Sequence, residues 1–252
     1  MTFLILCFAG MFLAFALIDT FAPARKLAPS PAWRVRGMLS FALYVAVAFT
    51  APMMWDGLLS QHTLFDASAF PLWIQIILGF GALQFGIYVW HRTMHAITPL
   101  WRVFHQMHHS AERVDIWGAF WFHPLDSAGF AFIGSLALVG GIGLEVTAAI
   151  TISLMAAFCA MFQHANLRTP RWLGYFITRP ESHVLHHGRD VHAFNYGDVP
   201  WFDMLLGTFR NPERAPEEAG FHDGASLRLF EMLTFQDVSK PKRSAKRSVP
   251  AE

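Results

Sequence analysis

Charge is what this sequence has least of. Asp, Glu, Lys and Arg make up 15% of its 252 residues, and hydrophobic residues make up 54%. An average soluble domain has about 25% charged residues. The deficit is concentrated in long uncharged runs, which excludes an ordinary soluble domain. The sequence therefore indicates an integral membrane protein with enough chain for one helical bundle.

Cysteine is also scarce. The two cysteines, Cys7 and Cys159, lie inside apolar runs and form no C-x-x-C motif. This pattern excludes a disulfide framework and a thiolate metal site. The formal net charge is only +1, and no nucleic acid partner is expected.

Five uncharged runs approach the length of about 20 residues that a membrane-spanning helix needs. They cover residues 2–18, 37–55, 71–90, 128–143 and 147–162. The last two are short and meet at a tight turn around Glu145, so a shallow hairpin that does not cross the membrane is the alternative. We expect one membrane-embedded domain of residues 1–236, followed by a basic, disordered tail of residues 237–252.

The positive charges lie on one side of this topology. All 19 Lys and Arg residues fall in segments that the five runs place on the same side, and both connectors on the opposite side contain none. Cytoplasmic loops of membrane proteins carry the excess of Lys and Arg. We therefore expect the N-terminus outside and the C-terminus in the cytoplasm.

Eight of the 13 histidines stand in three motifs. One H-x-x-x-H motif contains His91 and His95, and two H-x-x-H-H motifs occupy residues 105–109 and 183–187. Residues three and four apart share one face of a helix, so each motif can direct two or three imidazoles at one point. Because Pro99 separates the first two motifs, we expect them on different helices. All three motifs fall at cytoplasmic helix ends.

The number of histidines favours two metal ions. Imidazole suits zinc, copper, iron and nickel, and one tetrahedral ion takes only three or four ligands. His164 directly follows the fifth run and is expected in the same layer. His123 is open between a ligand, a supporting and a structural role, and His192 is a weaker ligand candidate. The isolated His62 and His222 are not expected at the site.

Seven segments resemble the fatty acid hydroxylase/sterol desaturase superfamily of integral-membrane di-iron oxygenases. In the order and spacing of that superfamily they are YVWHRTMH, WRVFHQMHHS, FHPLD, FQHANLR, HVLHHGRD, FNYGD and WFDMLLGTF. The resemblance implies two iron ions, which zinc can replace in purified protein, with O₂ as co-substrate. The ligands that it implies are His91, His95, His105, His108, His109, His164, His183, His186 and His187.

Two positions depart from the superfamily pattern. Many members have an acid where this sequence has Gln84, and ceramide-type hydroxylases have a histidine where it has Arg168. The second nitrogen of each ligating imidazole needs an orienting partner. Candidates near the motifs in the sequence are Gln84, Asp115, His123, Asp126, Glu181, Asn195 and Asp198.

The expected fold is all-α: an integral-membrane helical bundle of four to five spans, with a cytoplasmic helical cap that carries a histidine-rich dimetal site. Its histidine-box core covers residues 84–209. The expected function is hydroxylation, or less often desaturation, of a lipid such as a fatty acyl chain, a sterol-like ring, an alkylglycerol or a carotenoid. The sequence contains no dinucleotide-binding fingerprint, so electrons are expected from a separate ferredoxin or cytochrome b5-like donor with its reductase.

Functions of other classes remain as alternatives. The first is a membrane metal-binding or transport protein without oxygenase activity, although transport favours ionisable groups near the middle of the spans. A bis-histidine haem protein needs facing histidines on neighbouring helices, which adjacent pairs such as His108 and His109 do not supply. The third alternative is a non-catalytic scaffold stabilised by metal.

The topology is tested by cysteine labelling. An Asp66→Cys variant, with Cys7 and Cys159 replaced by alanine, should react with a membrane-impermeant thiol reagent in intact cells, because position 66 is expected outside. Labelling at position 66 only after the cells are opened would overturn this orientation.

Overall fold

A computed structural model of the chain describes residues 2–242 and is all-helical. Those residues contain no β-strand, and a single antiparallel bridge joins Gly188 to Ala219. The helical elements are α1 (Thr2–Phe21), α2 (Trp33–Thr50), η1 (Ala51–Met54), α3 (Asp56–Leu59), η2 (Ser60–His62), α4 (Leu72–Ala96), α5 (Thr98–Leu100), η3 (Trp101–His105), α6 (Gln106–His109), η4 (Ile116–Gly118), α7 (Pro124–Ser135), η5 (Leu136–Gly141), α8 (Val146–His164), η6 (Arg171–Tyr175), α9 (Pro180–His186), α10 (Trp201–Leu205), η7 (Ala225–Leu227) and α11 (Leu229–Leu233).

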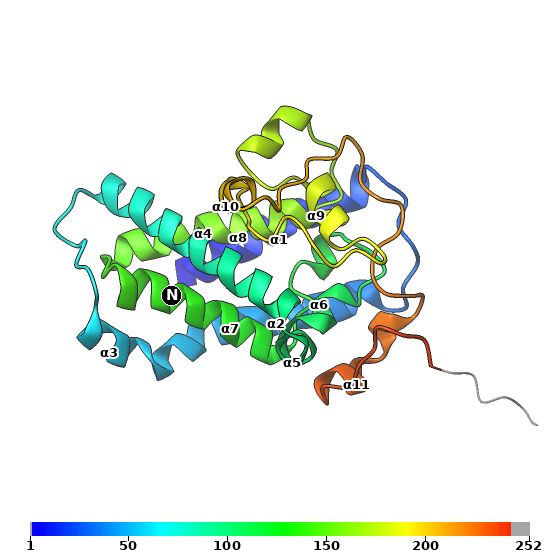
Figure 1. The fold of residues 1–252 in the computed structure, drawn as a ribbon, viewed down its shortest axis with the longest axis horizontal. Coiled ribbons are helices and arrows are strands. Elements are labelled where there is room, and N and C mark those ends of the chain that lie inside the picture. Colours follow the sequence, from blue (N-terminus) through cyan, green and yellow to red (C-terminus); the bar gives the residue numbers. More distant parts are fainter. Residues whose placement is uncertain (1, 243–252) are drawn as a thin grey trace, which may run out of the picture.

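Five helices form the bundle. By length and composition each can cross a membrane: α1, α2 with η1, α4, α7 with η5, and α8, which are 18 to 25 residues long. Figure 1 shows them side by side, with α3 at one end and the short helices α5, α6 and α9 toward the other. The all-α membrane bundle expected from the sequence is confirmed, and each of the five apolar runs is a helix long enough to span.

Two prolines mark where long helices end, and a π-helical turn follows the second of them. Pro52 lies in the 3₁₀ turn η1 that follows α2, and Pro99 lies in the short helix α5, after α4 has ended at Ala96. Proline lacks the N–H that continues a helix, so both mark the ends of long helices. The first two histidine motifs therefore lie on different helices, as expected. Between them, η3 is a π-helical turn, a feature frequent at functional sites.

Aromatic contacts join the first two helices to the cap. Phe12 of α1 stacks on Phe41 of α2 with ring centroids 4.2 Å apart. Tyr44 of α2 stacks on Phe120, which follows η4, at the same centroid separation of 4.2 Å. Phe12, Phe41 and Phe120 belong to one buried cluster. This cluster packs the segment after η4 against α1 and α2.

A half-buried carboxylate, Asp19, and a buried one, Asp115, fix the same boundary. Asp19, near the end of α1, accepts hydrogen bonds from the backbone N–H groups of Ile116 and Asn166, both at 2.8 Å. Asp115 accepts from the indole N–H of Trp33 at 2.8 Å and is 1% exposed. A buried carboxylate without such donors would be costly, so these contacts hold the cap against the membrane helices.

The packed chain continues past residue 236. Val238 is fully buried in a cluster with Met107 and Trp121, and Asp237 pairs with Arg102 at 3.0 Å. The expected domain boundary at residue 236 stays a prediction. The rest of the expected tail, residues 243–252, lies outside the described residues.

Gly37 permits the closest approach between α2 and the cap. A Cβ atom added there would lie 2.2 Å from the backbone oxygen of Trp117. Gly37→Ala should therefore force the two segments apart, and overpacking of this kind costs about 1–3 kcal/mol.

The measurement is thermal unfolding of the detergent-solubilised protein, which should melt several degrees below the parent. Gly10→Ala is the matched control, because no atom lies within 4 Å of a Cβ added at Gly10. Equal melting temperatures for the two variants would contradict this account of the α2–cap contact.

Candidate metal centre

Nine buried histidines converge in two groups at the cap end of the bundle. The ligand nitrogens within each group lie within 4.8 Å of one another. The first group is His91, His95, His105, His109 and His186, and the second group is His108, His164, His183 and His187. These are the nine that the sequence singled out as ligands. The structure brings them together, and metal binding itself stays a prediction.

Each H-x-x-H-H motif serves both groups. In the first motif, the outer histidines 105 and 109 belong to the first group, and His108 belongs to the second. In the second motif the roles are exchanged: residues 183 and 187 belong to the second group, and His186 to the first. Residues four apart share a helix face, and the residue between them points to one side. The two motifs therefore link the groups into one centre.

The tautomers of His91 and His186 are fixed by backbone carbonyls. Nδ1 of His91 lies 2.7 Å from the oxygen of Tyr196, and Nδ1 of His186 lies 2.7 Å from the oxygen of Phe194. A carbonyl only accepts, so both Nδ1 atoms carry the proton and both Nε2 atoms keep a lone pair. Those Nε2 atoms are 3.0 Å apart. Two lone pairs at this distance repel unless a cation lies between them.

In the second group a backbone carbonyl fixes the tautomer of His164. Nδ1 of His164 donates to the oxygen of Ala160 at 2.7 Å, and its Nε2 lies 3.0 Å from Nε2 of His183 and 3.2 Å from Nε2 of His108. Nitrogen ligands at right angles around an ion with bonds of about 2.1 Å would lie about 3.0 Å apart. The spacing of the nitrogens therefore fits bound metal ions.

Unpartnered ring nitrogens give a further reason to expect a metal ion. Within residues 2–242, several buried ring nitrogens have no hydrogen-bond partner. An orphaned polar atom in a protein interior costs about 1–3 kcal/mol. The nitrogens are both of His95, Nδ1 of His108, His183 and His187, and Nε2 of His109. In the second group the Nε2 atoms face one another, and Nδ1 is the unpartnered atom of His108, His183 and His187. A metal ion would therefore satisfy unpartnered nitrogens of His95 and His109, in the first group.

Burial keeps the cap histidines neutral. It lowers the pKa of six of them well below the usual value for imidazole, and the neighbouring imidazoles lower it further; the six are His105, His108, His109, His183, His186 and His187. Only the neutral form has a lone pair for a metal. The site is therefore in its metal-binding protonation state at neutral pH.

Asp126 orients His105. Its Oδ2 lies 2.8 Å from Nδ1 of His105, and its side chain is fully buried at the start of α7. This carboxylate–histidine pair directs Nε2 of His105 toward Nε2 of His91, 2.9 Å away. Such pairs fix the ring and raise the basicity of a ligand. Asp126 was among the partners considered from the sequence.

The loop after α9 supplies the two carbonyls and is itself strained. Phe194 and Asn195 have φ angles of 72° and 50°, a left-handed conformation that costs about 1–3 kcal/mol for a bulky residue. Asn195 anchors the loop by donating to the oxygen of Ser182 at 2.9 Å and accepting from the N–H of Arg210 at 2.8 Å. Asn195 thus supports His91 and His186 through the backbone and makes no hydrogen bond to an imidazole.

Asp203 holds the same loop, and it is not among the residues predicted from the sequence. Its two oxygens accept from the backbone N–H groups of Tyr196 and Gly197 at 2.9 and 2.8 Å, and from the Thr208 hydroxyl at 2.7 Å. It is fully buried. The one sequence signal for Asp203 is its place in WFDMLLGTF, a segment that resembles the superfamily.

Three other candidates have partners elsewhere, and a fourth, His192, lies beside the first group without belonging to it. His123 caps α7, where its Nδ1 accepts from the N–H of Leu125 at 3.1 Å. Glu181 accepts from the N–H and hydroxyl of Thr169, and Asp115 belongs to the α2–cap contact. His192 packs on His95 with ring centroids 4.6 Å apart but is in neither group.

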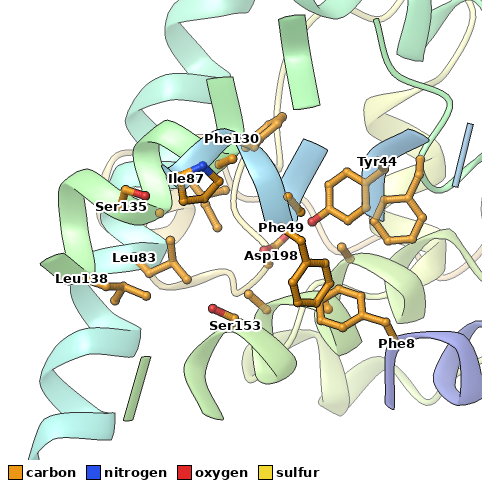
Figure 2. Close-up of a pocket in the computed structure, with 18 of the residues that line it drawn as sticks. Phe8, Tyr44, Phe49, Leu83, Ile87, Phe130, Ser135, Leu138, Ser153 and Asp198 are labelled. Carbon is orange, nitrogen blue, oxygen red and sulfur yellow. The ribbon is translucent and has the colours of Figure 1, made fainter. Parts of the chain in front are cut away.

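An elongated cavity leads away from the histidines. Its volume is about 450 Å³, and its wall includes Val146 and His164, the two ends of α8. Because a helix rises about 1.5 Å per residue, a cavity that follows α8 from one end to the other is on the order of 27 Å long. Figure 2 shows Phe8, Leu83, Ile87, Phe130 and Leu138 around it. A hydrocarbon chain suits these walls.

The histidine end of the cavity is polar. Asp198 lines it and accepts from Nε2 of Gln163 at 2.9 Å and from Nε2 of Gln84 at 3.4 Å. Burial raises the pKa of Asp198 to about 6, while the two amide donors lower it. Gln84 and Asp198, both considered from the sequence as partners of histidines, therefore bond to each other in residues 2–242 and not to an imidazole.

Comparisons with known proteins give one family. The sequence model described as fatty acid hydroxylase matches residues 76–208, a range that contains all nine histidines. Ornithine lipid hydroxylase OlsE of Rhizobium tropici is 34% identical over 162 residues, 62% of this chain and 48% of that protein. Delta(7)-sterol-C5(6)-desaturase of Nicotiana tabacum is 31% identical over 134 residues, 52% of this chain and 47% of that protein. The chain spans about half the length of these curated relatives, and no solved structure matches it.

The role of Asp126 is testable through metal affinity. Asp126→Asn keeps the shape of the side chain and removes the charge beside His105, and loss of such a partner typically weakens metal binding by about 10–100-fold. Competition between purified protein and a chelator for Zn²⁺ measures the change. Asp66→Asn, in the exposed segment before α4, should bind like the parent. Parent-like affinity in Asp126→Asn would show that this contact does not support the site.

Proposed function

Because the chain belongs to the fatty acid hydroxylase family, we propose that it is a membrane-bound non-haem di-iron oxygenase. It uses O₂ and external electrons to hydroxylate, or less often desaturate, a C–H bond of a lipid. One observation carries this proposal: two groups of buried, lone-pair-bearing histidines lie at the end of an elongated apolar cavity. The core of this activity is the segment 84–209.

The nine histidines are proposed to hold two iron ions. His91, His105, His108, His164 and His183 also line the cavity, so both groups border the space that the substrate enters. Bound iron would supply the reduction of O₂ and the oxidation of the C–H bond. The chain itself holds the imidazoles neutral, orients them through Asp126 and the backbone carbonyls, and surrounds the lipid with apolar side chains that exclude water.

The substrate is proposed to be a lipid that enters from the membrane. The two curated relatives are named for an ornithine lipid and for a sterol, and both compounds combine a large apolar portion with a polar group. A volume of about 450 Å³ falls within the range of about 300–1,000 Å³ that small-molecule sites occupy. The elongated form favours an extended chain over a fused ring system.

The site is proposed to face the cytoplasm. The Lys and Arg residues gather on the side of the histidine-rich cap, which supports an inward-facing cap and an outer N-terminus. Electrons would come from a separate ferredoxin or cytochrome b5-like protein with its reductase. An acidic donor would be attracted to this basic face.

A metal-binding or transport protein is the alternative from another class. The two groups lie together at one end of the bundle. A transport pathway would instead favour ionisable groups near the middle of the spans, and this distribution supports the oxygenase.

The function is tested by comparative lipidomics. Cells that express the protein should contain a lipid heavier by one oxygen, or lighter by two hydrogens, than the same lipid in cells without it. His108→Ala and His186→Ala each remove one ligand from a different group, and each should abolish the product, because residues that act as a unit are strongly non-additive.

His62→Ala and His222→Ala are the controls and should retain activity within a few-fold of the parent. Both histidines lie outside the two groups. Membrane levels of every variant must be measured beside the product. Full turnover in well-expressed His108→Ala or His186→Ala protein would contradict the proposed site.

A further inference from the structure

Three polar side chains line the cavity beside the histidines. Tyr44, Gln163 and Asp198 line the cavity together with His108 and His164, and we call these first three residues the polar collar. Figure 2 shows the Tyr44 hydroxyl directed toward the part of the cavity where Asp198 lies. Most of the remaining wall is apolar, so the collar is a local feature.

The hydrogen bonds of the collar leave acceptors free. Asp198 is an acceptor, so the amides of Gln163 and Gln84 must turn their N–H groups toward it, at 2.9 and 3.4 Å. Each amide oxygen then points elsewhere. Within residues 2–242 the Oε1 atoms of both glutamines are buried and without a partner. Gln163 is 6% exposed and Asp198 is 8% exposed.

Such acceptors require a donor. A buried amide oxygen without a partner costs about 1–3 kcal/mol, and a hydrocarbon chain cannot satisfy it. The rest of the cavity, toward Leu83 and Leu138, offers what a hydrocarbon chain needs. The cavity is thus polar beside the proposed metal ions and apolar away from them.

We propose that the polar collar binds a hydrogen-bond donor of the lipid substrate, a hydroxyl or an amide N–H, through the amide oxygen of Gln163. The carbon that is oxidised then lies close to the polar group of the lipid, and the alkyl chain extends along the cavity away from the histidines. This inference rests on the proposed function and adds to it the substrate class and the direction of binding.

The opposite direction has its own candidate residue. Asp56 lines the far end of the cavity and has one buried oxygen without a partner in the described chain. A lipid held there by its polar group would place its methyl end at the histidines. The two directions differ in which residue controls the preference for a donor and in which carbon is oxidised.

The first test is binding to the purified full-length protein in detergent, with two probes: 1-hexadecanol, which donates a hydrogen bond, and hexadecyl methyl ether, which only accepts. The parent should bind the alcohol about tenfold more tightly than the ether, the factor expected for one hydrogen bond to a buried acceptor. Gln163→Met should reduce this ratio to near one.

Two controls accompany that variant. Ser153 lines the same cavity, but its hydroxyl already donates to the oxygen of Ala149 at 2.8 Å, so Ser153→Ala should keep the tenfold preference. Asp56→Asn should keep it as well. Both affinities are measured on the same variant, so a general loss of folded protein affects both and does not change their ratio. Equal affinities in the parent, or a preference lost in Asp56→Asn and kept in Gln163→Met, would overturn the inference.

The second test is the position of oxidation. With 1-hexadecanol as the probe, the product should carry its new oxygen or double bond within the first few carbons from the hydroxyl. Oxidation at the methyl end would overturn the inference while leaving the oxygenase proposal intact. A binding preference that depends on Gln163, without any oxidation by iron-loaded protein supplied with O₂ and an electron donor, would refute the proposed function and support the collar.

Discussion

The constraint on which this structure depends is the burial of nine imidazoles whose ring nitrogens converge in two groups. In the first group, His91 and His186 cannot donate to each other, because the backbone fixes both protons on Nδ1. Burial also disfavours the protonated, charged form of the ring. Neither a hydrogen bond nor a proton therefore relieves the repulsion. Metal cations in both groups would relieve it, and they would bind the ends of five helical segments into one unit.

The cap follows from this constraint. The lone pairs must be aimed within a few tenths of an ångström, which needs partners that are themselves fixed. The strained loop at Phe194 and Asn195 provides carbonyl oxygens, and Asp203 and Thr208 hold that loop through buried hydrogen bonds. The membrane helices α4 and α8 hold His91, His95 and His164 in the same layer as the cap. The cost of the strained backbone is offset by the many bonds that converge on it.

The membrane helices have a second role, which is to form the wall of the cavity. Lipid cannot satisfy backbone polar groups, so the spans are helical, and their apolar side chains line a cavity that ends at the histidines. The outer faces of the same helices thus contact lipid, and their inner faces line a cavity that suits a hydrocarbon chain. Gln84, Gln163 and Asp198 form a buried polar layer beside the centre.

Much of this architecture could be predicted from the sequence, because its signals are local. Long uncharged runs predict the spans, and three- and four-residue spacing predicts that the histidines converge. The division of each H-x-x-H-H motif between two groups could not be predicted, since it depends on how α6 and α9 face each other.

The orienting partners were harder to predict. Asp126 could be proposed from its place near the motifs. The carbonyls of Ala160, Phe194 and Tyr196 could not, because every residue has a carbonyl and only the folded backbone selects one. Asp115 and Glu181 have the right chemistry, but in the fold they bond to other segments.

The most direct test of the central claim is the number of metal ions per chain, measured by elemental analysis of the purified, active protein. The account predicts close to two ions in the parent. It predicts close to one in the double variant His95→Ala/His109→Ala and in the double variant His164→Ala/His187→Ala, since each removes two ligands from one group only. A single ion in fully active parent protein, or an unchanged content in both double variants, would contradict the dinuclear centre.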